Sequence, residues 1–87
     1  MVDTDRKGID VASVQRESML RMGQNWQKLG KLNQAIDAYL RIVEESPSTR
    51  EGEAAKAALL DIAGGFEQGG RYHLAISLYD RLNAGVA

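Results

Sequence analysis

Few residues of this chain have the types and spacing that catalysis requires. His73 is the only histidine, and no carboxylate stands one helical turn before or after it to complete an acid–base pair. We interpret His73 as a helix-cap or surface residue, in preference to a base or a metal ligand. The acidic pairs Glu44-Glu45 and Glu51 with Glu53 stand near expected helix ends, where solvated structural roles are typical. The sequence therefore predicts no enzyme, no cofactor and no metal site.

Two glycine pairs could also indicate a binding site. Gly64-Gly65 and Gly69-Gly70 follow no strand pattern and precede no Gly-Lys-Ser or Gly-Lys-Thr sequence, so they do not form a phosphate-binding loop. Gly64 and Gly65 fall inside an expected helix, where each glycine costs about 1 kcal/mol relative to alanine. Two explanations stay open: a kink or tight packing within the chain, or a place where a partner's backbone lies close.

An internal repeat predicts the elements that position these residues. Repetition at a fixed spacing is typical of stacked supersecondary units. Six residues recur unchanged forty positions later in the chain: Leu20, Gly30, Ala35, Ile36, Tyr39 and Arg41 return as Leu60, Gly70, Ala75, Ile76, Tyr79 and Arg81.

The apolar spacing predicts four helices and no strand. They are expected over about residues 10–29, 33–45, 48–68 and 73–83. Asn33 and His73 are the expected N-caps of the second and fourth helices, and Ser48 with Glu51 forms an expected capping box. The predicted fold is all-α, with two antiparallel helix–turn–helix hairpins. We assign residues 1–8 to a disordered tail, 9–46 to the first hairpin and 47–87 to the second.

Composition restricts the class of protein. The 87 residues are 44% hydrophobic and 26% charged, as expected of one small globular domain. A net charge of -1 gives no overall attraction to nucleic acid or anionic membranes, and the chain has no cysteine. No apolar run is long enough to cross a membrane. We expect a cytoplasmic protein that binds neither membrane nor nucleic acid.

Residues 16–49 resemble a tetratricopeptide repeat, a helix–turn–helix unit. A second unit beginning at Lys56 resembles it too, although Ile42 and Leu82 stand where the family usually has a small residue. The resemblance implies a short α-solenoid in which Trp26 and Phe66 are buried at equivalent places. The matching positions are Met19, Met22, Gly23, Trp26, Gly30, Leu32, Ala35, Tyr39 and Pro47 in the first unit, and Leu59, Ile62, Ala63, Phe66, Gly70, Tyr72, Ala75 and Tyr79 in the second.

The resemblance also implies a function, because the common property of the family is binding other proteins. We predict a scaffold or assembly adaptor that holds a partner peptide or helix in a groove lined by the first helix of each unit. Leu20 and Gln24 stand where relatives that bind acidic chaperone tails have lysine and asparagine, so a different partner segment is expected. The predicted groove residues are Glu17, Leu20, Gln24, Gln27 and Lys28 in the first unit and Ala57, Leu60, Gly64, Glu67 and Gln68 in the second.

Two further hypotheses concern other surfaces. The alternative function is a nucleic-acid-binding helical repeat that uses Lys28, Lys31 and Arg71, with Arg41 and Arg81 beside them. Self-association is predicted separately, because two repeats are fewer than a stable stack usually contains. A homodimer would bury an apolar stripe on the last helix, unless Leu78 and Leu82 pack inward as core. That stripe consists of Leu74, Leu78 and Leu82.

Overall fold

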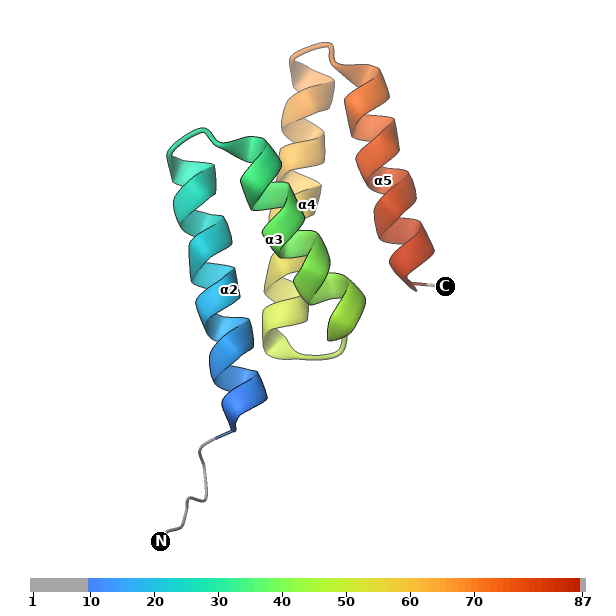
Figure 1. Cartoon of the computed structure of the whole chain (residues 1–87). Coiled ribbons are helices and arrows are strands. Elements are labelled where there is room, and N and C mark those ends of the chain that lie inside the picture. Colours follow the sequence, from blue (N-terminus) through green and yellow to red (C-terminus); the bar gives the residue numbers. More distant parts are fainter. Residues whose placement is uncertain (1–9, 87) are drawn as a thin grey trace, which may run out of the picture.

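Four helices make up the part of the chain that the structure describes, residues 10–86 (Figure 1). The structure is a computed structural model, and it contains no strand within this range. The predicted all-α fold is confirmed, whereas the predicted tail over residues 1–8 lies outside the described residues. The helices are α2 (Val11–Lys28), α3 (Leu32–Glu45), α4 (Arg50–Gln68) and α5 (Tyr72–Val86).

Consecutive helices form two antiparallel hairpins that stack on each other. The first hairpin is α2 with α3, the second is α4 with α5, and α3 packs against α4 where they meet. α2 also contacts α4, and α3 contacts α5. Figure 1 shows both hairpin turns at one end of the molecule and the α3–α4 connection at the other. The arrangement is a short helical solenoid, with α2 and α4 on one side and α3 and α5 on the other.

The two hairpin turns are built alike, as the repeat predicts. Gly30 and Gly70 have φ angles of 79° and 80°, a left-handed conformation that glycine adopts without steric cost. In the first turn the Lys31 N–H donates to the Trp26 carbonyl at 2.8 Å, and in the second the Arg71 N–H donates to Phe66 at 2.7 Å. These bonds satisfy carbonyls that the helix end would leave unpaired.

The core lies between the hairpins and centres on one aromatic residue. Tyr39 and Leu59 are its largest fully buried side chains. Gly23 makes room for the Tyr39 ring, because a Cβ atom added at Gly23 would lie 2.7 Å from Tyr39 Cε1. Trp26 and Phe66 are only partly buried against this core. Trp26 and Phe66 were predicted to be buried at equivalent places; they do occupy equivalent places, but the fully buried aromatic side chain is Tyr39.

The connection between α3 and α4 is held by Thr49. Its hydroxyl accepts from the Gly52 N–H at 3.0 Å and donates to the Ser46 carbonyl at 2.7 Å. The predicted capping box at Ser48 was therefore wrong by one residue. Gly52 lies against the backbone of Ser46 and Pro47, so that a Cβ atom there would overlap the Ser46 carbonyl oxygen. The connection is closely packed as a result.

Two other predicted caps were wrong for a common reason. α3 and α5 begin at Leu32 and Tyr72, so Asn33 and His73 lie inside these helices. The carbonyls of Lys31 and Arg71 already accept from Ala35 and Ala75, one helical turn on. Backbone hydrogen bonds in the turns therefore begin both helices one residue before the side chains that were predicted to cap them.

Candidate functional site

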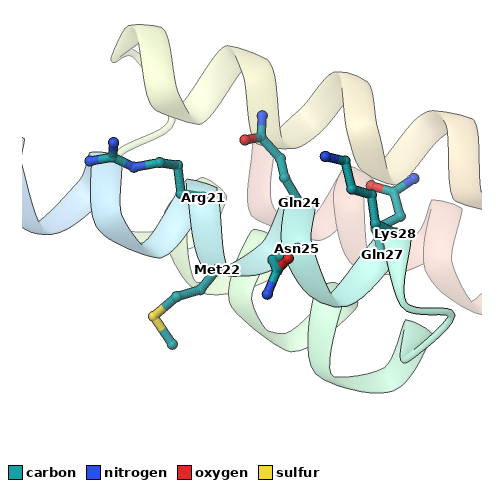
Figure 2. A pocket seen from close by; sticks show the side chains of 6 residues that line it. All are labelled: Arg21, Met22, Gln24, Asn25, Gln27 and Lys28. Atoms are coloured by element: carbon teal, nitrogen blue, oxygen red, sulfur yellow. The ribbon is translucent and has the colours of Figure 1, made fainter.

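One face of α2 is exposed over four successive positions, of which only Glu17 lies near a charged group of another helix, Arg50 at 4.0 Å. Glu17, Arg21, Gln24 and Lys28 follow each other at helical spacing, and all four are exposed. Figure 2 shows Arg21, Gln24 and Lys28 projecting from one side of the helix, whereas Met22 points away from them. The surface is shallow and hollowed between these side chains. It offers amide and charged groups of both signs.

The equivalent face of α4 lies beside it, because α2 and α4 contact each other. Its residues Ala57, Asp61, Gly64 and Gln68 stand forty positions after those of α2. Gly64 has an ordinary helical conformation, and a Cβ atom added there would meet nothing within 4 Å. The same is true of Gly65. Tight packing among the residues that the structure describes therefore does not account for either glycine.

Three of the predicted groove residues are engaged within the fold. Leu20 is buried in the core, at 8% exposure. Gln27 accepts a 2.7 Å hydrogen bond from the Tyr39 hydroxyl, and Glu67 accepts one of 2.8 Å from Tyr79. Burial raises the pKa of Tyr39, and the bond to Glu67 raises the pKa of Tyr79. Leu20, Gln27 and Glu67 therefore contribute to the packing and hydrogen bonding of the chain itself.

The two rows lie on neighbouring helices, α2 and α4, which contact each other. Leu60 is exposed and stands at the outer edge of α4. The sequence prediction omitted Arg21 and Asp61, although each stands one turn from a predicted residue and they are equivalent to each other. We define the groove surface as Glu17, Arg21, Gln24 and Lys28 of α2 with Ala57, Asp61, Gly64 and Gln68 of α4, all of them exposed except the half-buried Gly64.

An ion-pair cluster joins the two rows at the end near the α3–α4 connection. Arg16 donates to Glu51 at 3.3 Å, and Arg50 lies 3.4 Å from Glu51 and 4.0 Å from Glu17. Glu51 is 4% exposed, so its predicted solvated role was wrong. Its own backbone N–H, and then Arg16 and Arg50, lower the pKa of Glu51 although burial acts in the opposite direction. The cluster fixes α4 against α2.

The basic residues of the alternative function are distributed over several surfaces. Lys28 lines the α2 surface, whereas Arg71 and Arg81 line a groove between α3 and α5. Arg41 lines a third groove, between α2 and α3. The described residues thus form no single basic stripe of these side chains.

His73 and the acidic residues are the remaining groups whose chemistry could serve catalysis or metal binding. His73 is exposed on α5. Within residues 10–86 no cluster of three or more histidine, cysteine, aspartate or glutamate residues could hold a metal ion. Over the same range, no helix combines the length and the apolar character needed to cross a membrane.

Comparison with known families agrees with this geometry. The family model described as "Tetratricopeptide repeat" matches residues 17–49, which span most of α2, all of α3 and the connection after it. The match supports a repeat of the tetratricopeptide type over these residues. The row on α2 lies in the first helix of the matched repeat, and the row on α4 in the helix that packs beside it. Searches among curated proteins and among solved structures found no match.

Proposed function

We propose that the groove surface binds a segment of another protein, and that the chain is a non-catalytic interaction module. Tetratricopeptide repeats are interaction modules as a class, and the repeat here contributes one of the two rows. The observation that supports this particular surface is Gly64, a helix-interior glycine on the groove face whose missing side chain leaves open space.

Gly64 is unfavourable for the isolated chain. A helix-interior glycine costs about 1 kcal/mol relative to alanine, and here no turn and no close packing offsets that cost. Glycine within a regular element is typical of places where another backbone approaches closely. A partner segment lying along α4 would use this space and offset the cost in the complex.

The side chains around Gly64 favour a polar partner segment of mixed charge. Gln24 and Gln68 flank it with amides that form no hydrogen bond within the described residues, so they can pair with a partner's backbone. Arg21 and Asp61 supply both charges at the middle of the groove, which favours neither a strongly acidic nor a strongly basic segment.

Selection from a displayed library of random peptides tests the proposal. Peptides recovered on the immobilised wild-type chain are measured against Gly64→Gln, which places in the second row the side chain that Gln24 has in the first. We expect at least about a tenfold loss of affinity, equal to about 1.4 kcal/mol. Recovery of no peptide, or equal binding by Gly64→Gln, would contradict the proposal.

Ser77→Gln is the matched control. Ser77 is exposed on α5 and lines the groove between α3 and α5, away from the groove surface. Peptides that use the groove surface bind this variant as they bind the wild type. If Ser77→Gln loses affinity and Gly64→Gln does not, the binding surface is the α3–α5 side.

A further inference from the structure

The contact between the two hairpins provides a template for a second contact. In it, α3 of the first hairpin packs against the second hairpin, and Tyr39, Leu40 and Val43 are at most 2% exposed. Leu20 of α2 is 8% exposed in the same core cluster. Each of these residues has an equivalent forty positions later, on the side of the second hairpin that faces away from the first.

Leu60 and Tyr79 are the apolar members of this set, and with Ile76, the equivalent of the partly buried Ile36, they form a surface that we call the outer face. Leu60, equivalent to Leu20, is 43% exposed, and Ile76 is 59% exposed. Tyr79 is partly buried, whereas Tyr39 is fully buried. The outer face thus presents an exposed leucine and an exposed isoleucine beside Tyr79, whose hydroxyl donates to Glu67 of the same hairpin and whose ring is only partly covered.

The opposite end of the stack has the complementary surface, which we call the receiving face. In the second hairpin, Leu59 and Ile62 are 0% and 5% exposed. Their equivalents in the first hairpin are Met19, which is partly buried, and Met22, which is 46% exposed. Both methionines line a groove of about 280 Å³ between α2 and α3, together with Trp26, Ala38 and Arg41. Methionine adapts well to apolar surfaces of irregular shape.

We propose that the outer face of one copy binds the receiving face of another, so that copies stack head to tail. The two faces are the equivalents of the two sides of a contact that the chain already makes, so the occupant they fit is a second copy. Because different surfaces meet, the contact is heterologous and leaves both types of face free at the ends of the stack. The assembly therefore grows instead of closing as a two-fold dimer.

Polar replacements make this contact weaker than its template. Asp80 and Asn83 stand where the first hairpin has Leu40 and Val43. Gln15 and Ser18 stand where the second hairpin has Ala55 and Ala58. Both faces have exchanged apolar for polar residues, which reduces the apolar area buried and lets the stack dissociate.

This arrangement differs from the dimer predicted from the sequence. Leu78 and Leu82 are 4% and 3% exposed and belong to the core of a single chain, so they pack inward, as the alternative interpretation had it. Only Leu74, at 38% exposure, remains of that stripe. A free surface of all three leucines does not exist in this fold.

Two variants that each block one face provide the test. Met22→Glu places a charge on the receiving face, and Ile76→Glu places one on the outer face. Met22 and Ile76 are 46% and 59% exposed, so both variants should fold and keep the circular dichroism spectrum of the wild type. In sedimentation from micromolar to millimolar concentration, we expect the wild-type mass to rise beyond twice the monomer mass of 9.5 kDa. Each variant alone should remain monomeric. Their equimolar mixture retains one intact pair of faces and should form a one-to-one dimer that grows no further.

Leu29→Glu is the matched control. Leu29 is 63% exposed in the first hairpin turn, and it belongs to neither face. This variant should assemble as the wild type does. A wild type that remains monomeric throughout overturns the proposal. So does a mixture that forms no dimer, or a Met22→Glu variant that associates as well as the wild type.

Discussion

The two hairpins have the same local design but different surroundings. In each, a glycine of positive φ closes the turn, and a tyrosine of the second helix donates to a side chain of the first, Gln27 for Tyr39 and Glu67 for Tyr79. Yet Tyr39 is fully buried and Tyr79 only partly. The difference comes from the neighbour, because the second hairpin covers the first and no described residue covers the second. Equivalent positions in a stack therefore differ in energy according to what lies over them.

Truncating the two tyrosines should give the largest difference between the hairpins. Tyr39→Ala should lower the free energy of unfolding by about 3–5 kcal/mol, the range for removing a buried aromatic ring. Tyr79→Ala should cost about half as much or less, since its ring is partly exposed. Urea denaturation of both variants measures this directly. Equal losses would mean that the second hairpin does not depend on its position in the stack.

Gly23→Ala should give the next largest effect. The new methyl group would press on the Tyr39 ring, at 2.7 Å from Cε1, and overpacking of this kind costs about 1–3 kcal/mol. The gain in helix propensity offsets part of that loss. The second hairpin already has Ala63 at this position, so Ala63→Gly should not raise stability. A Gly23→Ala variant more stable than the wild type in urea would contradict the packing described here.

Gly64→Ala should instead raise the free energy of unfolding. With no atom near the added Cβ, only the helix propensity changes, and the free energy of unfolding should rise by about 1 kcal/mol. Thermal or urea denaturation of the isolated chain is sufficient to measure this. Gly23 and Gly64 are both helix-interior glycines, so a contrast in sign separates a glycine that the fold requires from one that it does not. Destabilisation by Gly64→Ala would show that the space beside Gly64 is already occupied.

The smallest expected effect concerns the stability of the fold at acid pH, which depends on the ion pair between Arg16 and Glu51. Because the folded state lowers the pKa of Glu51, its contribution is present above the ordinary carboxyl value of 4.5 and is lost as the pH falls through the folded-state value. The wild type should therefore lose stability more steeply below about pH 4.5 than Glu51→Gln, which has no carboxylate there. Urea denaturation at a series of pH values compares the two. Parallel curves would exclude a contribution from Glu51.

The architecture was predictable because it depends on local signals. The forty-residue repeat, the glycines that end α2 and α4, and the apolar spacing of the helices each act within one or two turns of chain. Asp10 caps α2 by accepting from the Ala12 N–H at 3.1 Å, close to where the apolar pattern begins. Such features do not require knowledge of what packs against them.

Burial at equivalent positions was not predictable in the same way. Leu20 and Leu60 are the same residue in the same register, yet they are 8% and 43% exposed because only Leu20 has a hairpin stacked over it. Glu51 was assigned to solvent because acidic residues favour helix N-termini, but Arg16, thirty-five residues earlier, draws it into a buried pair. The predicted place of Leu20 in the groove and the predicted solvation of Glu51 were both wrong because contacts between distant segments override a correct local pattern.

The closed connection between α3 and α4 has a mechanical consequence. Thr49 binds both helix ends, and Gly52 leaves no space beside the backbone of Ser46 and Pro47. Arg16 and Glu51 also hold α2 to the start of α4, so side-chain contacts as well as the backbone join the two hairpins. If the groove surface binds a partner segment as proposed, we expect complex formation to require adjustment of that segment and little movement of this chain.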